Sequence, residues 1–237
     1  MKSIAILGST GSLGRQALEV IAENKERLKV VALSAKSNYR LLIEQARIFN
    51  PLYVCYQGGE DIKSDLPVGT VLISGENALI ELCAVAEYDT LLSTVVGISG
   101  LLPTIEAVKR GKTVALANKE TLVCAGGYIM RLARQYSAQI LPVDSEHSAI
   151  AQCLCSGKAS EVEKLILTAS GGAFRNIPIE LLAEQKPEDA LKHPNWDMGA
   201  KITIDCATMV NKGFEVMEAM HLFDMPISKI DVVMHIE

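Results

Sequence analysis

The sequence lacks a positive charge excess, a long apolar run and abundant aromatic residues, and these shortages exclude several classes of protein. Its 23 Lys and Arg residues are outnumbered by 28 Asp and Glu, for a net charge of −5. Such a chain has no broad positive field to attract nucleic acid or an anionic membrane surface. No apolar run approaches the length of a membrane span. With 237 residues, 49% of them hydrophobic, we expect a soluble globular protein of one large domain or two small ones.

Cysteine pairs at metal-binding spacing are also missing. The six cysteines include no C-x-x-C pair, and Cys153-x-Cys155 alone is weak support for a metal site. Reduced, largely buried thiols are the better interpretation. Met1 is followed almost at once by an apolar strand, with no targeting segment ahead of it. We therefore expect a cytoplasmic protein.

The first motif is a glycine-rich turn between a strand and a helix. Residues 2–7 are apolar, Gly8-Ser-Thr-Gly11-Ser-Leu-Gly14 follows, and an amphipathic helix comes next. The spacing G-x-x-G-x-x-G is a variant of the dinucleotide fingerprint. In this context glycines allow the backbone to approach a pyrophosphate, and the helix N-terminus supplies N–H donors. The alternative is a purely structural turn, but the strand–turn–helix context favours dinucleotide binding.

The end of the second strand, residues 28–34, indicates which dinucleotide binds. An NAD site would place an acidic residue there for the ribose 2′-hydroxyl. This chain has Lys36, Ser37 and Asn38 instead. One cation and two hydrogen-bonding side chains suit a 2′-phosphate, and hence NADP(H), although an ordinary polar turn with a helix cap would look similar.

Strands and helices alternate as far as residue 143, which predicts an α/β fold with a doubly wound, Rossmann-like parallel sheet. Ligands of such sheets bind beyond the carboxyl ends of the strands. Asn118-Lys119-Glu120 follows the strand expected at 113–117. We therefore expect this tripeptide where cofactor and substrate meet.

A second strand end, at Pro142-Val143, is followed by Asp144-Ser145-Glu146. Residues i and i+2 of an extended segment point to the same face, so the two carboxylates could converge. Hard oxygen ligands suit Mg²⁺ or Mn²⁺. The alternative is that Asp144 or Ser145 caps the helix expected near Glu146.

After residue 147 the pattern changes and suggests a second, α+β domain. A small-residue turn at Ser170 could admit an anion, with His193, Asn211 and Lys212 as further donors. Residues 178–192 are predicted to be helical, broken in two by Pro187. Trp196 lies in a polar loop that could act as a lid. A final strand is expected at 230–236.

Several motifs together resemble the 1-deoxy-D-xylulose 5-phosphate reductoisomerase family of the non-mevalonate isoprenoid pathway. They are GSTGSLG, LLANKETLV, LPVDSEHSAI, ASGGAFR, HPNWDMGAKI and ATMVNKGFEVMEA, and the resemblance runs from Met1 to about Glu237. It implies a metal-assisted rearrangement of 1-deoxy-D-xylulose 5-phosphate, by retro-aldol cleavage and aldol rejoining. NADPH then reduces the aldehyde to 2-C-methyl-D-erythritol 4-phosphate.

The resemblance also assigns roles to individual residues and organises the chain. It implies an NADPH-binding domain at 1–143 and a catalytic domain at 144–237, usually in a homodimer. Lys119, Asp144, Glu146 and Glu215 would be catalytic, the last three as metal ligands; without the resemblance, Glu215 would be interpreted as a solvated helix carboxylate. NADPH would contact Thr10, Gly11, Ser12, Leu13, Lys36, Ser37, Asn38, Asn118, Glu120 and Gly199. The phosphorylated sugar would contact Lys119, Ser145, Glu146, Ser170, His193, Trp196, Cys206, Asn211, Lys212 and Glu215.

The sequence departs from the family pattern in three places. Cys206 stands where the family usually has a serine that donates to the substrate phosphate. The cation at Lys36 is shifted by one position in the 2′-phosphate loop. The family also continues past the final strand, so we expect a chain truncated at its C-terminus, which leaves open whether the 237 residues turn over alone.

Two alternative functions are open at this point. One is an NADP-dependent semialdehyde-type reductase, which would need a cysteine nucleophile such as Cys124 or Cys153. The other is a non-catalytic NADP-binding module.

Overall fold

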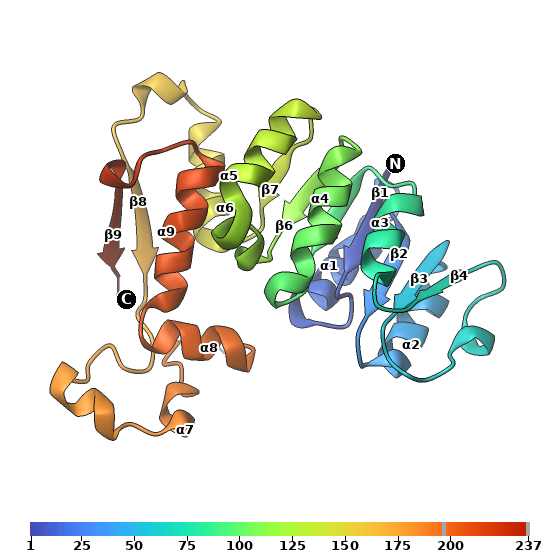
Figure 1. Cartoon of the computed structure of the whole chain (residues 1–237), viewed down its shortest axis with the longest axis horizontal. Helices are drawn as coiled ribbons and strands as arrows, with labels where there is room; N and C mark the ends of the chain where they lie inside the picture. Colours follow the sequence, from blue (N-terminus) through green and yellow to red (C-terminus); the bar gives the residue numbers. More distant parts are fainter. Residues whose placement is uncertain (196–197, 236–237) are drawn as a thin grey trace. The chain divides into compact units, whose positions relative to one another are not determined.

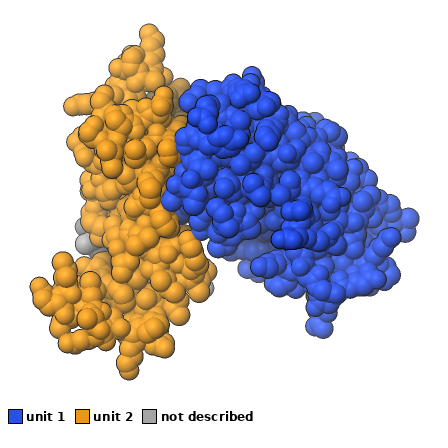
Figure 2. All heavy atoms as spheres, in the orientation of Figure 1, with its two compact units in different colours: residues 1–143 blue, residues 144–237 orange. Residues whose placement is uncertain are grey.

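A computed structural model describes residues 1–195 and 198–235 of the chain. The chain forms two compact units, Met1–Val143 and Asp144–Glu237 (Figure 2). The boundary between Val143 and Asp144 lies a few residues before the change of sequence pattern after residue 147.

Unit 1 is built on a seven-stranded parallel sheet with the order β4-β3-β2-β1-β5-β6-β7 (Figure 1). All six strand pairs are parallel. The strands are β1 (Lys2–Leu7), β2 (Leu28–Ala35), β3 (Tyr53–Tyr56), β4 (Val71–Ser74), β5 (Thr90–Ser93), β6 (Thr113–Leu116) and β7 (Ile140–Pro142). The predicted doubly wound α/β fold is confirmed.

The helices of unit 1 cover the sheet in two groups. They are α1 (Ser12–Glu23), α2 (Tyr39–Phe49), α3 (Ala78–Val85), α4 (Leu101–Lys109) and α5 (Lys119–Gln135), with 3-10 turns η1 (Lys63–Asp65) and η2 (Gly97–Gly100). From β1 the strand order runs through β2 and β3 to β4 on one side, and through β5 and β6 to β7 on the other. Because βαβ crossovers are right-handed, this reversal places the two groups of helices on opposite faces. Figure 1 shows α3, α4 and α5 side by side in front of the strands.

The hydrophobic pattern of the sequence explains this packing. The central strand β1 buries Ala5, Ile6 and Leu7 completely, as expected for a parallel strand covered on both faces. One core cluster joins β1, β2 and β3 to the apolar sides of α1 and α2, through residues such as Leu18 and Leu42. This core holds the carboxyl ends of β1, β2 and β3 in place.

Unit 2 is smaller and packs around a two-stranded parallel sheet. Its strands are β8 (Leu165–Ala169) and β9 (Ile230–Met234), paired in register from Leu165↔Ile230 to Ala169↔Met234. The helices are α6 (Ser145–Leu154), α7 (Pro187–Ala190), α8 (Ala200–Ala207) and α9 (Val210–Leu222), with 3-10 turns η3 (Ala159–Glu161), η4 (Ile179–Glu184) and η5 (Ile227–Lys229). A small core of Leu165, Leu167, Ala219 and Ile230 joins β8 and β9 to α9.

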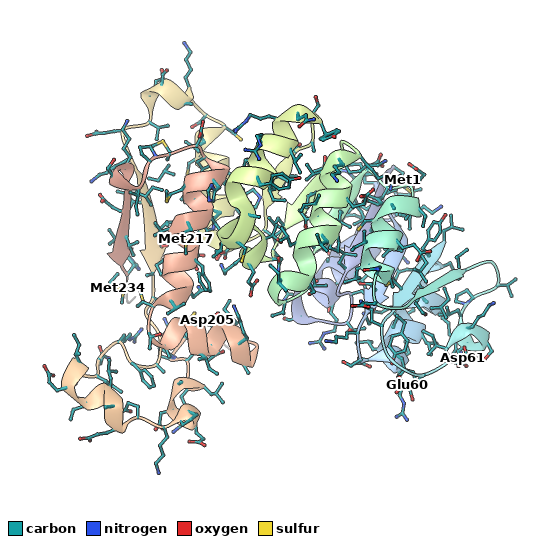
Figure 3. The ribbon with its side chains drawn as sticks, in the orientation of Figure 1. Met1, Glu60, Asp61, Asp205, Met217 and Met234 are labelled. Atoms are coloured by element: carbon teal, nitrogen blue, oxygen red, sulfur yellow. The ribbon has the colours of Figure 1, made fainter. Side chains whose placement is uncertain are left out.

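The strands of unit 2 and three of its residues can be followed in Figures 1 and 3. The arrows of β8 and β9 point the same way, toward the end where α8 lies (Figure 1). Figure 3 labels three landmarks of this unit: Asp205 on α8, Met217 on α9 and Met234 at the end of β9. The turn after β8 lies beside Met234, since a Cβ on Gly171 would meet the Met234 side chain at 2.8 Å.

Candidate functional site

The glycine turn of unit 1 has the geometry of an anion-binding loop. Gly8 has φ +84°, a conformation that side-chain-bearing residues rarely adopt, and a Cβ there would meet Thr94 Oγ1 at 2.9 Å. A Cβ on Gly14 would lie 2.4 Å from the Gly8 carbonyl oxygen, so only glycine lets α1 pack this close. At Gly11 the only close atom is the Gly8 oxygen at 3.3 Å, and the residue is exposed. The first and third glycines therefore shape the turn, and the middle one leaves it accessible.

This turn lies at the point where the strand order reverses. β1 pairs with β2 on one side and with β5 on the other. Thr94, just after β5, donates from its hydroxyl to the carbonyl oxygens of Leu7 (2.7 Å) and Gly8 (3.2 Å), which joins the two strand ends. Dinucleotides bind at such a switch point with their pyrophosphate on the helix N-terminus. Ser12 and Leu13, both exposed, begin α1 there, and Thr10 precedes them.

The end of β2 has one buried anchor and an exposed polar loop. Ser34 accepts a hydrogen bond from the Gly8 N–H at 3.0 Å, so it fixes the glycine turn to β2. Asn38 caps α2 by accepting from the Leu41 N–H at 3.2 Å. Lys36 and Ser37 are exposed. Of the three residues expected at a 2′-phosphate, Asn38 already has a structural task, whereas Lys36 and Ser37 present their side chains to solvent.

Asn118 connects two loops at the carboxyl edge of the sheet. Its amide donates to the carbonyl oxygens of Val95 (2.8 Å) and Gly97 (2.9 Å), and its Oδ1 caps α5 by accepting from the Thr121 N–H. It also donates to Glu120 at 3.0 Å. The side chain is buried, so Asn118 positions the loops and fixes Lys119 and Glu120 at the start of α5.

In unit 2 three of the expected catalytic carboxylates converge. Carboxylate oxygens of Asp144, Glu146 and Glu215 all lie within 4.8 Å of one another. Asp144 occupies the N-cap position of α6, but its side chain makes no capping hydrogen bond. The alternative interpretation of Asp144 as a helix cap therefore has no support in its geometry. Ser145 does not cap either; its hydroxyl donates to Glu146 at 2.6 Å.

The donor set of this cluster fits a hard divalent cation. Three carboxylates offer oxygen atoms, the ligands that Mg²⁺ and Mn²⁺ prefer. Glu215 is only 2% exposed and comes from α9, while Asp144 and Glu146 come from the start of α6. Three negative charges this close repel one another unless a cation balances them.

Lys212 supplies a positive charge to the same group. Its ammonium donates to Glu146 Oε1 at 2.7 Å, to the Thr168 carbonyl oxygen at 2.7 Å and to Glu215 Oε2. Asn211 donates to the second oxygen of Glu215 at 2.5 Å. Burial alone would raise the pKa of Glu146, but the hydrogen bonds from Lys212 and Ser145 and the charge of Lys212 lower it. Glu146 is therefore ionised at neutral pH.

Two buried residues that the sequence did not single out, His147 and Glu218, lie beside the carboxylate cluster. His147 is fully buried, and its Nε2 lies 2.8 Å from the Glu215 carbonyl oxygen. Its Nδ1 lies 3.4 Å from Asp144, and ligand atoms of Asp144, His147 and Glu218 lie within 4.8 Å of one another. One signal was available: Lys212, Glu215 and Glu218 recur every three residues, which places three charges on one face of α9.

The turn after β8 gathers most of the expected phosphate-binding residues. A Cβ on Gly172 would lie 1.9 Å from the Cys206 carbonyl oxygen, so the turn touches the end of α8. Arg175 donates to the Ser170 carbonyl oxygen at 2.8 Å. Desolvation and the nearby Arg175 charge lower the pKa of His193, and a backbone hydrogen bond with Gly171 opposes them. Ser170, His193 and Cys206 thus border one turn.

Two further expected residues belong to the segment between α7 and α8. Trp196, the expected lid residue, lies outside the described residues. Gly199 is exposed and is the N-cap of α8 in unit 2, whereas the other expected NADPH contacts lie in unit 1.

The fold and these residues define a class: a Rossmann-like unit with a glycine turn at its switch point, followed by a unit that carries clustered carboxylates. Two family models match the chain. "1-Deoxy-D-xylulose 5-phosphate reductoisomerase" matches residues 4–126, and the C-terminal domain of the same enzyme matches residues 140–223. The chain belongs to the 1-deoxy-D-xylulose 5-phosphate reductoisomerase family.

Individual relatives agree with this assignment. The reductoisomerase of Lachnoclostridium phytofermentans is 54% identical over 239 residues, which cover 98% of this chain and 61% of that protein. The reductoisomerase of Pelotomaculum thermopropionicum is 50% identical over 240 residues, or 99% of this chain and 62% of that protein. The chain thus spans about three fifths of the length of these relatives.

Solved structures show the same fold. A DOX-P reductoisomerase in complex with NADPH, fosmidomycin and magnesium superposes with a TM-score of 0.90 at 38% identity, covering 100% of this chain and 62% of that one. The Zymomonas mobilis enzyme in complex with NADPH gives 0.91 at 38% identity, covering 99% and 62%. A putative homoserine dehydrogenase from Archaeoglobus fulgidus, at 17% identity and a TM-score of 0.53, shares only the fold.

Proposed function

We propose that the chain carries the cofactor-binding and metal-binding parts of an enzyme that converts 1-deoxy-D-xylulose 5-phosphate to 2-C-methyl-D-erythritol 4-phosphate, with NADPH and Mg²⁺ or Mn²⁺. In this proposal unit 1 binds NADPH and unit 2 holds the metal and the phosphorylated sugar. The observation that carries it is the convergence of Asp144, Glu146 and Glu215. Family membership and relatives that bind NADPH and magnesium support it.

In unit 1 the proposed NADPH contacts follow the glycine turn. Thr10, Gly11, Ser12 and Leu13 would meet the pyrophosphate, because the exposed N-terminus of α1 presents N–H groups and a positive dipole end. Lys36 and Ser37 would face the 2′-phosphate, and Asn38 would hold their loop in place by capping α2. Asn118 and Glu120 would border the nicotinamide end. When bound, NADPH supplies a hydride to the substrate carbonyl.

In unit 2 the chain's own groups would bind and orient the sugar. Asp144, Glu146 and Glu215 would hold the divalent ion, which, when bound, polarises the substrate oxygens. Ser145, an exposed residue, and Lys119 are proposed as further contacts of the sugar. Ser170, His193, Asn211, Lys212 and Cys206 would hold the phosphate, and Gly199 is proposed as a further NADPH contact.

An NADPH-oxidation assay with 1-deoxy-D-xylulose 5-phosphate tests this proposal. It is run on the 237-residue chain and on a version extended to the length of its relatives, with Mg²⁺ or Mn²⁺ and after EDTA. We expect EDTA to abolish turnover and Mn²⁺ to restore it. Glu215→Gln should lower turnover about 100-fold or more, since even partners of metal ligands contribute 10–100-fold. The exposed Glu184→Gln is the matched control.

Three outcomes would count against the proposal: turnover that survives EDTA, equal use of NADH, or no NADPH consumption by the extended version. The first would favour the semialdehyde-type alternative, whose nucleophile would be the exposed Cys124 or Cys153. NADPH binding without turnover by the extended version would favour a non-catalytic NADP-binding module.

We also propose a cytoplasmic homodimer. The six cysteines, all among the described residues, are free, which suits a reducing compartment. The expected burial is right for Cys55 and Cys83 and wrong for the exposed Cys124, Cys153 and Cys155. Among the helices of the described residues, none has both the length and the apolar character needed to cross a membrane. Light scattering after size exclusion tests the dimer, and a monomeric mass would overturn it.

A further inference from the structure

Lys212, proposed above as a phosphate contact, also forms ion pairs with the carboxylate cluster. Its side chain is only 8% exposed, yet the charged end meets two carboxylates, Glu146 and Glu215, that also belong to the proposed metal site. A buried ammonium is unfavourable unless it is paired, and here two carboxylates and the Thr168 carbonyl oxygen pair it. The ammonium thus acts as a counter-cation of the carboxylate cluster.

A divalent ion competes with that ammonium for the same two carboxylates, Glu146 and Glu215. Mg²⁺ binds oxygen at about 2.0–2.1 Å, closer than the 2.7 Å between Lys212 Nζ and Glu146 Oε1. It also carries twice the charge, so it attracts the carboxylates more strongly than an ammonium does. Two cations on the same pair of carboxylates would repel each other in this partly buried place. The ion should therefore replace the ammonium.

The third partner of Lys212 indicates where the released ammonium goes. Thr168 lies in β8 directly before Ala169, and the Ser170–Gly172 turn follows. An ammonium that leaves Glu146 and Glu215 but stays near the Thr168 carbonyl oxygen remains beside this turn. Three groups of different character border the turn: the Arg175 guanidinium, the His193 ring and the end of α8 at Cys206. A freed ammonium adds positive charge there.

From these contacts we infer that Lys212 is a built-in counter-cation that the divalent ion displaces toward the Ser170–Gly172 turn, where it binds the phosphate group of the substrate. Metal binding and phosphate binding then reinforce each other through one side chain. By linkage, each ligand raises the affinity for the other by the same factor. The inference rests on the metal site of the proposed function.

Amine labelling of the native chain tests this inference, with the extent of acylation at each lysine read by mass spectrometry. Without metal, Lys212 should be acylated slowly because it is buried and ion-paired. Mg²⁺ or Mn²⁺ should raise its rate several-fold. Lys164 and Lys192, which pair with Asp231 and Asp189 on the surface of the same unit, should not change and serve as internal references.

Inorganic phosphate provides the second arm of the same experiment. It should slow the acylation of Lys212 when Mn²⁺ is present and have no effect on Lys212 in the metal-free chain. Protection that is equal with and without metal, or absent in both, would overturn the coupling.

A parallel Mn²⁺ titration followed by electron paramagnetic resonance separates two kinds of failure. If Mn²⁺ binds but the labelling of Lys212 stays constant or falls, displacement is wrong and the metal site stands. If Mn²⁺ does not bind, the metal site of the proposed function fails and the inference fails with it.

Discussion

Among single residues, the most unusual feature is the buried charge that unit 2 concentrates on one helix. Lys212, Glu215 and Glu218 are each less than a tenth exposed, and all three lie on α9. Charged groups are rarely buried unless they are paired or bind metal. Burying these charges costs folding free energy, and a role in ligand binding best explains why they are buried.

Cys206 borders the Ser170–Gly172 turn, which we propose binds phosphate, and it stands where the resemblance leads us to expect a serine. A thiol is a weaker hydrogen-bond donor than a hydroxyl. We predict that Cys206→Ser tightens binding of a phosphate-bearing ligand by about 0.5–1.5 kcal/mol, the net value of one hydrogen bond. The KM for 1-deoxy-D-xylulose 5-phosphate in the extended version measures it, with the exposed Cys124→Ser as control. An unchanged KM would refute the prediction.

The pKa of His193 should depend on the charge of Arg175. Desolvation and the Arg175 charge lower its pKa, so the ring is neutral at pH 7. Because the folded-state pKa is lowered, stability is highest above the ordinary histidine pKa and decreases as the pH falls toward the lowered value. We predict that Arg175→Gln raises the pKa of His193 and reduces this loss.

An NMR titration of the histidine ring protons measures the change directly. Arg131→Gln, at an exposed position of unit 1, is the control and should leave His193 as it is. A pKa of His193 that is unchanged, or falls, in Arg175→Gln would show that the guanidinium is not the cause.

The residues of the site differ in how well the sequence alone predicts them. The i, i+2 spacing of Asp144 and Glu146 suggested convergence on the assumption of an extended segment. That assumption is wrong, because α6 begins at Ser145; the two carboxylates converge at the start of a helix instead. Glu215 lies about 70 positions further on, and only family resemblance connects it to them. The resemblance assigns Lys212 to phosphate, but its ion pairs with Glu146 and Glu215 depend on how α9 packs beside α6, which no local pattern encodes.

Among the elements, the glycine turn shows how packing fixes a site. Gly14 must be glycine because the first turn of α1 packs directly against the backbone of Gly8 and Ser9. We predict that Gly14→Ala destabilises the chain by about 1–3 kcal/mol, since its Cβ would press on backbone atoms of Gly8 and Ser9. Urea unfolding measures this.

Gly127→Ala is a matched control in another helix of the same unit. Gly127 is exposed on α5, and a Cβ there meets nothing within 4 Å. Alanine is the better helix former, so we expect a gain of up to about 1 kcal/mol. Equal effects of the two substitutions would contradict the packing argument.

Elements with strong periodic patterns were predictable, and those held by tertiary contacts were less so. The strand at Lys2–Leu7 and the cap at Asn38 match the sequence expectation. Residues 178–192 were expected to be two helical pieces broken by Pro187. They form a 3-10 turn and a four-residue helix that begins at Pro187, because proline fits the first position of a helix. The final strand ends at Met234 rather than Ile236, which lies outside the described residues.

In the molecule as a whole, the glycine turn proposed to bind NADPH and the carboxylates proposed to bind metal lie in different units of the chain. The glycine turn and the Lys36–Ser37 loop belong to unit 1, and the three carboxylates belong to unit 2. Each set is held by contacts within its own unit. The proposed metal site can therefore be tested in this chain even though the chain spans about three fifths of the length of its relatives.

A Mn²⁺ titration of the 237-residue chain, followed by electron paramagnetic resonance, is the sharpest test of the carboxylate cluster. We predict one saturable site per chain, with an affinity reduced about 100-fold or more in Glu215→Gln and unchanged in the exposed Glu184→Gln, since a lost ligand costs at least as much as a lost supporting partner. No saturable binding, or equal binding by native chain and Glu215→Gln, would contradict the assignment of Asp144, Glu146 and Glu215 as a metal site.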